Sequence, residues 1–287
     1  MAESNKNTEQ TREFHFTVKD FDRIRKLIYD HAGISLNQSK EDMVYSRLAR
    51  RLRATGLQTF DQYLAFLETN DAAEWEAFTN SLTTNLTSFF REPHHFPILT
   101  EHIQQHKNTH PIMLWCSASS TGEEPYSMAM TMVDLFGSYT PPVKILATDL
   151  DTNVLAIARE GVYPLDRIEK LPEDTVKRFF LKGTGTQAGH VKVRQELRDM
   201  ITFRQINLLA PTWSIRGPFD AIFCRNVMIY FDKQTQYNIL EKFVPLMQPD
   251  GLLFAGHSES FYHAANLFKL RSKTVYELAA NAQHKTR

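Results

Sequence analysis

The sequence predicts two folded parts, a small all-helical domain followed by a doubly wound α/β domain. Apolar residues recur at helical spacing as far as residue 84. Beyond Pro93, runs that are apolar throughout alternate with helical segments, a pattern typical of parallel strands buried on both faces. We therefore expect a disordered tail over residues 1–13, a helical domain over 14–84, a linker over 85–94 and the α/β domain over 95–287.

The helical domain is expected to contain four helices joined by short loops. Apolar positions three and four residues apart between Phe21 and Ile28 mark the first helix, and Gly33 ends it. Three more helices are expected over residues 40–54, 60–68 and 74–82.

Five apolar runs predict the strands of the α/β domain, over residues 112–115, 143–148, 201–205, 219–224 and 251–255. One stretch breaks their alternation with helices, because Gly183, Gly185 and Gly189 lie close together between two short apolar runs. This pattern predicts a small antiparallel β-hairpin inserted at about residues 178–200.

The composition excludes several classes of protein. Lys plus Arg and Asp plus Glu both number 33, so a globally basic nucleic-acid binder is disfavoured. No apolar run is long enough to span a bilayer, and the polar N-terminal segment does not resemble a signal peptide. Cys116 and Cys224 fall in apolar runs, and we expect both to be unpaired. A soluble, cytoplasmic protein is therefore expected.

The strongest functional signal is the segment 111–127, in which a predicted strand runs through small residues into a helix. Small residues and Gly122, where the helix begins, allow the backbone to approach a ligand closely. Glu123 and Glu124 at the start of this helix would repel a pyrophosphate but suit a ligand that carries an ammonium group. The two acids are equally explained by the helix dipole alone.

A second acid at the next strand favours a nucleoside ligand. Asp149 ends that strand, about 27 residues beyond Gly122, where dinucleotide and related folds place the carboxylate that binds the ribose hydroxyls. Asp149 could instead cap the following helix, but Asp151 or Thr152 can serve as the cap and leave it free. S-adenosylmethionine, which has an amino group, a sulfonium and no phosphate, fits both acids.

Four segments resemble the signatures of a known family, the bacterial chemotaxis methyltransferases that esterify glutamates of chemoreceptors (the CheR family). They are residues 84–92 (TNLTSFFRE), 120–127 (STGEEPYS), 224–231 (CRNVMIYF) and 253–259 (LFAGHSE). The resemblance covers about residues 15–275. Family members often have glycine where this chain has Ala118, and we expect this to shift the backbone slightly without loss of binding.

The resemblance implies a set of contacts with S-adenosylmethionine. It implies that Glu123 holds the amino group of the cofactor and that Asp149 holds its ribose. The other implied contacts are Asn85, Thr87, Arg91, Asn207, Leu208, Arg225 and Asn226. Without the resemblance, Arg91 would be interpreted as a surface arginine and Asn207 as a turn former.

The implied reaction is methyl transfer from the sulfonium to a glutamate carboxylate, which at neutral pH needs no general base because its pKa is near about 4.3. Arg91 and Tyr230 are our candidates for the catalytic residues that orient the reactants, although Tyr230 could equally be a core aromatic with a satisfied hydroxyl. No metal site is expected, because His94, His95 and His257 lack the spacing of metal ligands.

A cluster of arginines in the second predicted helix is the expected docking surface for a protein substrate. Arg47, Arg50, Arg51 and Arg53 fall within seven residues, and the spacings of the first three place them on one helix face. Such runs are usually solvated, but in a chain of zero net charge they favour an acidic partner. The resemblance implies that this partner is the set of methylated helices in the cytoplasmic part of membrane chemoreceptors.

The inserted hairpin is the second expected contact with a receptor. An exposed strand edge can accept an extended peptide by strand addition. In some members of the family this subdomain tethers the C-terminal pentapeptide of certain receptors, which would recruit the enzyme to receptor arrays. The residues implied in such a tether are Lys182, Gly183, Gly185, Gly189 and Lys192, although glycine-rich turns are common in other settings.

Three other function classes fit the sequence less well. A nucleic-acid amino-methyltransferase would carry two prolines in the segment from Asn226 to Tyr230, which has none. A dinucleotide dehydrogenase would carry a Gly-x-Gly-x-x-Gly turn, which is absent from 111–127. A non-catalytic cofactor-binding regulator is disfavoured because the implied site residues are complete.

Overall fold

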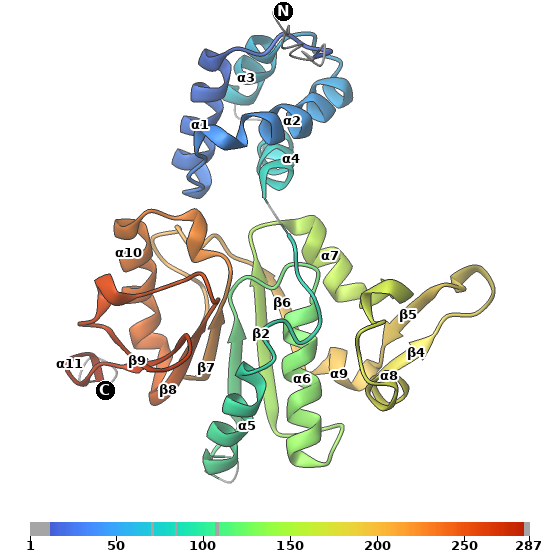
Figure 1. Ribbon diagram of the computed structural model, residues 1–287, viewed down its shortest axis with the longest axis vertical. Coiled ribbons are helices and arrows are strands. Elements are labelled where there is room, and N and C mark those ends of the chain that lie inside the picture. The colour runs from blue at the N-terminus through green and yellow to red at the C-terminus, as the bar shows by residue number, and fades with distance from the viewer. Residues whose placement is uncertain (1–11, 70–71, 84, 107–108, 284–287) are drawn as a thin grey trace, which may run out of the picture. The chain divides into compact units, whose positions relative to one another are not determined.

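The computed structural model describes residues 12–69, 72–83, 85–106 and 109–283. The chain divides into two compact units, residues 1–83 and 84–287, which we call the helical unit and the α/β unit (Figure 1). Most of the tail expected over residues 1–13 lies outside the described residues. Arg12 and Glu13 are described, and they form ion pairs with residues of the second helix. In the described part of the chain, no helix is long and apolar enough to cross a membrane.

The helical unit contains the four predicted helices: α1 (Val18–Ala32), α2 (Glu41–Thr55), α3 (Phe60–Glu68) and α4 (Ala72–Leu82), with a 3-10 turn η1 (Gln38–Lys40) before α2. Thr17 and Asp20 form a capping box at the start of α1. Gly33 ends α1 in the left-handed conformation that favours glycine. Phe21, Leu48 and Leu64 are among the fully buried side chains that form the core of this unit.

The α/β unit is built on a seven-stranded sheet in the order β6-β2-β1-β7-β8-β10-β9. Its strands are β1 (Ile112–Cys116), β2 (Val143–Asp149), β6 (Ile201–Gln205), β7 (Phe219–Cys224), β8 (Met247–Ala255), β9 (Phe268–Ser272) and β10 (Val275–Leu278). The five predicted strands, β6 to β8 in this order, are parallel. The antiparallel pair β10 and β9, which extends the sheet, was not predicted.

Helices and turns connect these strands. They are α5 (His95–His106), α6 (Glu123–Phe136), α7 (Thr152–Glu160), α10 (Lys233–Phe243) and α11 (Ala280–Gln283), with the 3-10 turns η4 (Met228–Tyr230), η5 (Val244–Leu246) and η6 (Tyr262–Ala264). Two hydrophobic clusters pack on the sheet. One joins Leu114 to residues of α5 and α6, and the other joins Trp115 to residues of α10. Because neighbouring strand residues point to opposite faces, both faces of the sheet are covered, which confirms the predicted doubly wound fold.

The predicted insertion is a small three-stranded antiparallel sheet in the order β3-β5-β4, and Figure 1 shows it standing apart from the main sheet. It consists of β3 (Val162–Pro164), η2 (Leu165–Arg167), α8 (Glu173–Phe179), β4 (Phe180–Lys182), η3 (Gly185–Gln187), β5 (His190–Val193) and α9 (Gln195–Asp199). The prediction of a two-stranded hairpin was incomplete, because β3 is too short to show a periodicity. Strand β5 pairs with both β3 and β4, so β5 is central and the open edges of this sheet belong to β3 and β4.

Candidate functional site

The topology places two loops side by side at the carboxyl ends of β1 and β7. The chain runs from β1 outward through β2 to β6, and then returns to β7 on the other side of β1. Strands β1 and β7 are parallel neighbours, with Cys116 opposite Phe223. Open α/β sheets bind ligands where the strand order reverses in this way. The segment after β1 and the segment after β7 therefore form the candidate site.

The turn after β1, residues 117–122, is held close to the sheet by its backbone. The Ser117 N–H donates to the Phe223 carbonyl at 2.8 Å, and the Ser119 N–H donates to the Thr148 carbonyl at 2.8 Å. Gly122 has φ +101°, and a Cβ there would lie 2.9 Å from the Tyr163 hydroxyl oxygen. Only glycine fits this position, as the sequence pattern indicated.

Asp149 ends β2 beside this turn, and each oxygen of its carboxylate accepts a backbone hydrogen bond. Its Oδ2 accepts from the Ser120 N–H at 2.8 Å, and its Oδ1 accepts from the Asp151 N–H at 3.0 Å. Asp151 caps α7 by accepting from the N–H groups of Asn153 and Val154, so Asp149 is not the helix cap. Desolvation of its carboxylate raises the pKa of Asp149 to about 6.

Glu123, at the first position of α6, has a buried oxygen with unused capacity to accept hydrogen bonds. Its side chain is 1% exposed, and its Oε2 accepts from the Thr121 hydroxyl at 2.6 Å. Its Oε1 lies 3.0 Å from Arg167 Nη2 but accepts no hydrogen bond from any residue that the structure describes. A buried acceptor without a donor is costly unless a ligand supplies one. The ammonium group of S-adenosylmethionine supplies such a donor, so the residues present fit this cofactor.

Glu124 cannot serve a ligand in the same way, which corrects the expectation that both acids of this helix suit an ammonium group. Its Oε1 accepts from the Cys116 thiol at 3.2 Å, and its Oε2 lies 2.9 Å from Arg225 Nη1. Burial raises the pKa of Glu124, and Arg225 opposes this rise. Glu124 is therefore the partner of a buried cation. Cys116 and Cys224 are both free and buried, as predicted.

The segment 85–92 is bonded to the turn after β1 and to the helices α6 and α7. The Asn85 side chain donates to Asp151 Oδ2 at 2.8 Å, and the Asn85 carbonyl accepts from the Ser120 hydroxyl at 2.9 Å. The Phe90 N–H donates to the Ser127 hydroxyl at 2.9 Å. These bonds bring the segment together with Asp149 and Glu123, although the sequence separates them by more than 30 residues.

Two other predicted residues of this segment are bonded through the backbone. Arg91 is half-buried, and its Nη1 donates to the Leu86 carbonyl at 2.9 Å. Thr87 is half-buried, and its carbonyl lies 3.5 Å from Arg167 Nη1. The charge of Arg91 also lowers the pKa of Glu124.

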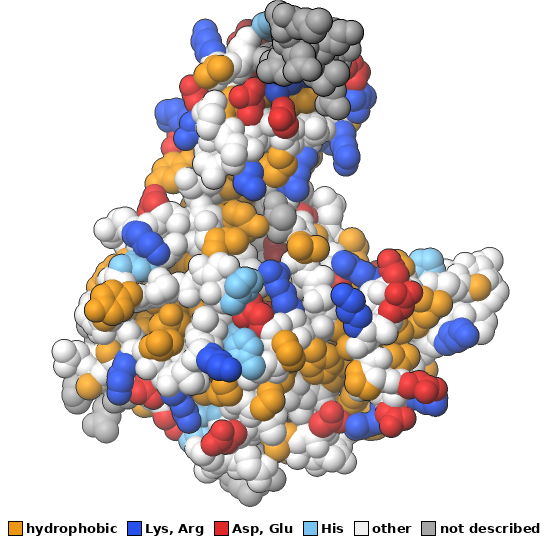
Figure 2. Space-filling view, viewed as in Figure 1, with side chains coloured by type: hydrophobic (Ala, Val, Ile, Leu, Met, Phe, Trp, Pro, Cys, Tyr) orange, Lys and Arg blue, Asp and Glu red, His pale blue; other side chains and the backbone are white. Residues whose placement is uncertain are grey.

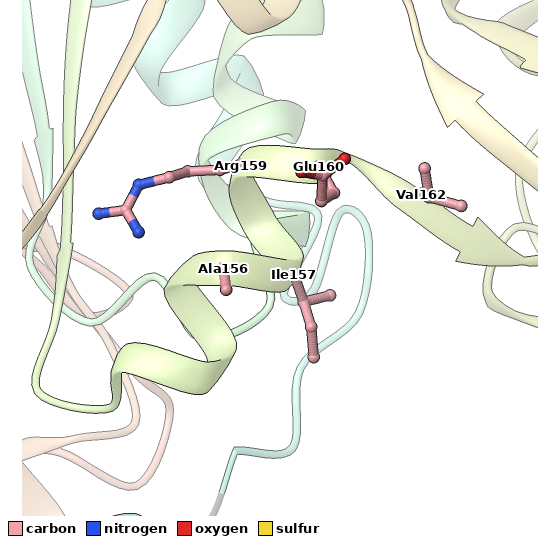
Figure 3. Close-up of a pocket in the computed structure, with 5 residues that line it drawn as sticks. All are labelled: Ala156, Ile157, Arg159, Glu160 and Val162. Carbon is pink, nitrogen blue, oxygen red and sulfur yellow. The ribbon is translucent and has the colours of Figure 1, made fainter. Parts of the chain in front are cut away.

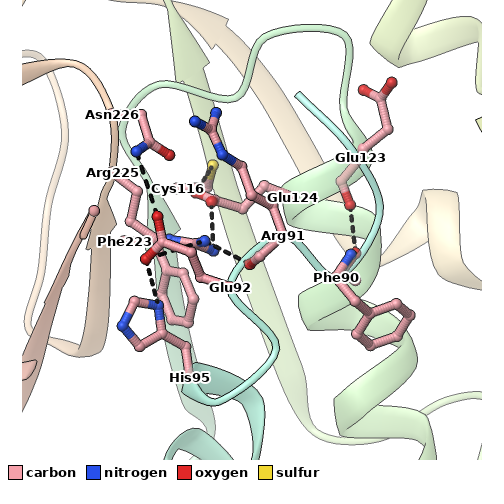
Figure 4. A network of polar contacts seen from close by, with 12 residues as sticks. Phe90, Arg91, Glu92, His95, Cys116, Glu123, Glu124, Phe223, Arg225 and Asn226 are labelled. Atoms are coloured by element: carbon pink, nitrogen blue, oxygen red, sulfur yellow. Dashed lines mark hydrogen bonds and ion pairs between the residues drawn. The ribbon is translucent and has the colours of Figure 1, made fainter. Parts of the chain in front are cut away.

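Arg225, the first residue after β7, is buried beneath the site and paired with acids of the protein, whereas the resemblance implied that it contacts the cofactor. Its side chain is fully buried; it donates to the Arg91 carbonyl, pairs with Glu124 and lies 3.7 Å from Glu92. Figure 4 shows Arg225, Glu92 and Asn226 converging, whereas the Glu123 carboxylate points away from this network. Two acids require Arg225 as their cation, so its side chain holds segment 85–92 against the sheet.

The loop after β7 depends on a residue to which the sequence analysis gave no role. Glu259 is buried, and its carboxylate accepts from the N–H groups of Asn226 at 2.9 Å, Val227 at 2.9 Å and Met228 at 2.7 Å, as well as from Gly256. The quoted motif 253–259 contained this residue, but only the fold shows that it caps η4. Glu259 thereby fixes the backbone that carries Asn226 and Tyr230.

Tyr230 is half-buried at the end of η4. Within the described part of the chain, its hydroxyl has no hydrogen-bond partner, so it is not the core aromatic with a satisfied hydroxyl that was the alternative interpretation. Asn226 adopts φ +59° and places its side-chain amide 3.4 Å from Glu92 Oε1. The backbone of both predicted residues is thus fixed; the Asn226 side chain donates to Glu92, and the Tyr230 hydroxyl is left for a ligand.

Asn207 and Leu208 follow β6, two strands from β1. The Asn207 Oδ1 accepts from the Leu209 N–H at 2.9 Å, and its carbonyl accepts from Trp213 Nε1 at 3.1 Å. Leu208 is buried in the cluster that packs on α10. Asn207 therefore acts as a turn former, as the alternative interpretation held, at the same edge of the sheet as Asp149.

Backbone strain is concentrated at this site. Among the described residues, five that are not glycine have positive φ, and four of them, Phe90, Glu92, Ser120 and Asn226, lie in the segments above. Strained backbone persists where the surrounding structure over-determines it, and it is common at functional sites. The strain therefore marks the same region that the motifs mark.

The four arginines of α2 do not form one exposed face, which corrects the predicted docking surface. Arg47 donates to the carbonyls of Ser81 and Thr83 at the C-terminal end of α4, and Arg51 pairs with the buried Glu74 at 2.6 Å. Both are half-buried because this side of α2 packs on α4. Arg53 is exposed and pairs with Glu13. Acidic and basic side chains are interspersed over the helical unit in Figure 2.

Two further features of the α/β unit resemble binding sites. Metal-ligating atoms of Glu92, His94 and His95 lie within 4.8 Å of one another, but the Arg225 cation next to Glu92 opposes a second cation. A mainly apolar surface pocket is lined by Ala156, Ile157, Arg159, Glu160 and Val162 at the end of α7 (Figure 3). None of its lining residues belongs to the network around Glu123 and Asp149.

Comparison with known proteins identifies both units. The family described as "CheR methyltransferase, SAM binding domain" matches residues 85–277, and that described as "CheR methyltransferase, all-alpha domain" matches residues 19–83. The chain is 54% identical to chemotaxis protein methyltransferase 2 of Pseudomonas aeruginosa, with 93% of this chain and 96% of that protein covered.

Two further relatives carry the same description. The chain is 52% identical to the chemotaxis protein methyltransferase of Salmonella typhimurium, with 94% of each chain covered, and 54% identical to that of Escherichia coli, with 90% of each chain covered. With the cofactor-compatible acids at the switch point, these matches show that the chain belongs to the CheR family of chemotaxis methyltransferases, with S-adenosylmethionine as its cofactor.

Proposed function

We propose that this methyltransferase acts on glutamate side chains of bacterial chemoreceptors and forms glutamate 5-O-methyl esters during chemotactic adaptation. The observation that carries the proposal is that the site offers an arginine and an uncommitted tyrosine hydroxyl, Arg91 and Tyr230, but no buried histidine that can act as a base. His95 is fully buried, and desolvation lowers its pKa to about 3. A substrate that is already ionised, such as a glutamate, suits this arrangement.

When bound, S-adenosylmethionine supplies an electrophilic methyl group on a sulfonium. The protein then has to hold a carboxylate oxygen in line with that methyl group and exclude water from it. No proton moves, because the carboxylate is already deprotonated and the product is an ester. Arg91 orients the carboxylate by its charge, while Glu123 and Asp149 hold the cofactor by its amino group and its ribose.

The proposed substrate is tested by incubating the protein with methyl-labelled cofactor and membranes that contain chemoreceptors. Label in the receptor that is released as methanol by base establishes a carboxyl methyl ester. Label that resists base, or that appears in nucleic acid, overturns the proposal. Membranes without chemoreceptors are the control.

The role of Arg91 is tested by Arg91→Ala. We expect this variant to lose most of its activity, because the two other arginines beside α6, Arg167 and Arg225, are paired with Glu123 and Glu124 and cannot replace the Arg91 guanidinium. The measurement is the rate of methyl transfer at saturating cofactor, with cofactor binding measured in parallel. Turnover near that of the unsubstituted protein, with cofactor bound, contradicts the assignment.

Docking of the receptor is the second part of the proposal. The exposed arginines of α2, Arg50 and Arg53, attract the acidic helices that carry the glutamates. The open edge of β4, with exposed Lys182 and Leu181 and the turn glycines Gly183, Gly185 and Gly189, accepts a receptor tail peptide by strand addition. Such a tether raises the local substrate concentration without new contacts at the active site. The enzyme then works in the cytoplasm at receptor arrays.

The tether is tested by binding of a receptor tail peptide to the intact protein and to a variant in which a short linker replaces residues 180–193. Binding to the first and not the second supports the tether, provided that both bind the cofactor equally. Equal peptide binding to both proteins removes the β4 edge from the proposal.

A further inference from the structure

Arg167 is a charged residue at the candidate site that lies outside the four family motifs. It ends η2, the first turn of the inserted subdomain after β3. Its Nη2 lies 3.0 Å from Glu123 Oε1, and its Nη1 lies 3.5 Å from the Thr87 carbonyl. One guanidinium thus reaches from the insertion to two elements that the cofactor site is built from.

Glu123 faces few charged or titratable groups. From η2 it faces Arg167, and from β3 it faces the Tyr163 phenol, whose pKa burial and the Glu123 charge raise. The Thr121 hydroxyl supplies its other polar contact. Desolvation raises the pKa of Glu123, and Arg167 is the cation that opposes this rise. A carboxylate buried without a cation tends to take up a proton and lose the charge that attracts an ammonium group.

The position of Arg167 is fixed by the insertion around it. The Leu165 N–H donates to the Gly189 carbonyl at 3.0 Å, and the Ile168 N–H donates to the Leu165 carbonyl at 3.1 Å. Ile168 is buried in the cluster that packs on α6. The Tyr163 hydroxyl donates to the Thr121 carbonyl at 2.7 Å, which ties β3 directly to the turn after β1. Arg167 therefore meets Glu123 from a rigid base.

We propose that Arg167 is a positioning residue for the cofactor, which keeps the Glu123 carboxylate charged and aimed while leaving its Oε1 free to accept from the cofactor ammonium. The contact geometry supports this division of labour, because Arg167 lies at ion-pair distance from Oε1 without forming a hydrogen bond to it. The inference rests on the proposed role of Glu123. It gives the inserted subdomain a part in cofactor binding that is separate from any contact with a receptor.

The test measures the Kd of S-adenosylhomocysteine, which keeps the amino group, by titration calorimetry between pH 5.5 and pH 8.5. The proteins are the unsubstituted chain, Arg167→Gln, Arg167→Lys, Glu123→Gln and the double variant with both glutamines. We expect Arg167→Gln to weaken binding about tenfold near neutral pH and to move the acid limb of the affinity profile to higher pH. Arg167→Lys, which keeps a charge, retains most of the affinity.

The double variant separates a positioning role from a direct contact. If Arg167 acts through Glu123, removing it in the Glu123→Gln background causes no further loss of affinity. An equal loss in both backgrounds shows that Arg167 contacts the ligand itself and overturns the inference. Arg178→Gln, which removes an exposed arginine of the same insertion that pairs with Asp134, is the matched control and leaves the Kd unchanged.

Failure of this inference is distinguishable from failure of the proposed function. If Glu123→Gln binds weakly while Arg167→Gln binds as the unsubstituted chain does, the role of Glu123 stands and that of Arg167 falls. If Glu123→Gln itself binds normally, the proposed role of Glu123 falls as well. If Arg167→Gln does not fold, as judged by circular dichroism, Arg167→Lys and its acid limb decide the matter.

Discussion

The two loops at the switch point of the sheet follow neighbouring parallel strands, yet they use their charged groups in opposite ways. After β7, Arg225 is buried and meets Glu92 and Glu124. The buried Glu259, which follows β8, accepts from three backbone N–H groups of the same loop and from that of Gly256. After β1, Glu123 is equally buried but keeps one oxygen without a hydrogen-bond donor. The charged groups around the loop after β7 are therefore paired within the protein, whereas Glu123 after β1 has an oxygen that a ligand can use.

This difference shows how to tell a buried acid that stabilises the fold from a buried acid that can bind a ligand. Glu123 and Glu124 are adjacent in the sequence and both buried, and each has one hydroxyl or thiol donor and one arginine within 3.0 Å. The arginine beside Glu124 is fully buried, whereas Arg167 beside Glu123 is 36% exposed. Buried polar groups in folded proteins nearly always have partners, so the Glu123 oxygen that accepts no hydrogen bond from a described residue marks the place where a ligand can bind.

The largest effect on stability is expected from Arg225→Met, which removes the buried cation after β7. Glu124 and Glu92 would be left buried without a cation, which costs about 3–5 kcal/mol of unfolding free energy. Urea denaturation measures this loss. Adding Glu124→Leu to the variant should restore a large part of the stability, because a buried pair is often replaceable by apolar residues. If the unfolding free energy of Arg225→Met lies within about 1 kcal/mol of that of the unsubstituted chain, Glu92 and Glu124 do not depend on Arg225 as their cation.

The next largest effect is expected on cofactor affinity, from a substitution of Glu123 after β1. Glu123→Gln should lower the affinity for S-adenosylhomocysteine about 10–100-fold, because hydrogen bonds to charged groups contribute about 1.5–3 kcal/mol. Its unfolding free energy should change much less than that of Arg225→Met, because Glu123 has few partners to lose. Calorimetry and urea denaturation of the same samples test both statements. A stability loss as large as that of Arg225→Met would place Glu123 in the framework instead.

The pH dependence of cofactor binding sharpens the comparison further. The pKa of Asp149 in the folded chain is about 6, above its ordinary value of 3.8, so the folded chain binds this proton more readily than the unfolded chain. Between these two values, the contribution of Asp149 to stability therefore falls as pH rises. Cofactor affinity has the opposite trend, because the ribose hydroxyls donate to the ionised carboxylate.

Below pH 6 we expect the affinity for S-adenosylhomocysteine to fall by up to about tenfold per pH unit. Calorimetry across this range measures the trend, and Asp149→Asn should bind weakly and keep only the part of the acid limb that Glu123 contributes. An affinity that is flat between pH 5 and pH 7 in the unsubstituted chain would mean that Asp149 stays ionised or does not touch the ligand.

The smallest effects are expected for the exposed arginines of α2, which alternate with the half-buried Arg47 and Arg51. Arg50→Glu should raise the KM for receptor membranes a few-fold at low salt, with the effect weakened by added salt. Its unfolding free energy should change by less than about 0.5 kcal/mol, because Arg50 is exposed. Arg51→Gln, by contrast, should destabilise the helical unit by leaving Glu74 buried without its cation. If Arg50→Glu leaves the KM unchanged at low salt, α2 is not the docking surface.

Much of the fold was predictable because its signals are local. The helices of the first unit follow from apolar spacing and from the conformational freedom of Gly33 at a helix end. The parallel strands follow from runs that are apolar throughout. The strands that were missed, β3, β9 and β10, are short or carry exposed polar residues, so they have no distinctive pattern of their own. They form only because a neighbouring strand completes their hydrogen bonds.

The sequence by itself determined the doubly wound fold, the glycine turn and the three acids beside it, Glu123, Glu124 and Asp149. Those features depend on residue type and spacing, which a linear pattern contains. The tertiary structure decided which charges are left for a ligand. It assigned Arg225 and Glu124 to each other, gave Glu259 to the loop that carries Tyr230, and brought Arg167 to Glu123. The energy of a charge pair depends on the distance between the two groups in space. For residues far apart in the chain, only folding sets that distance.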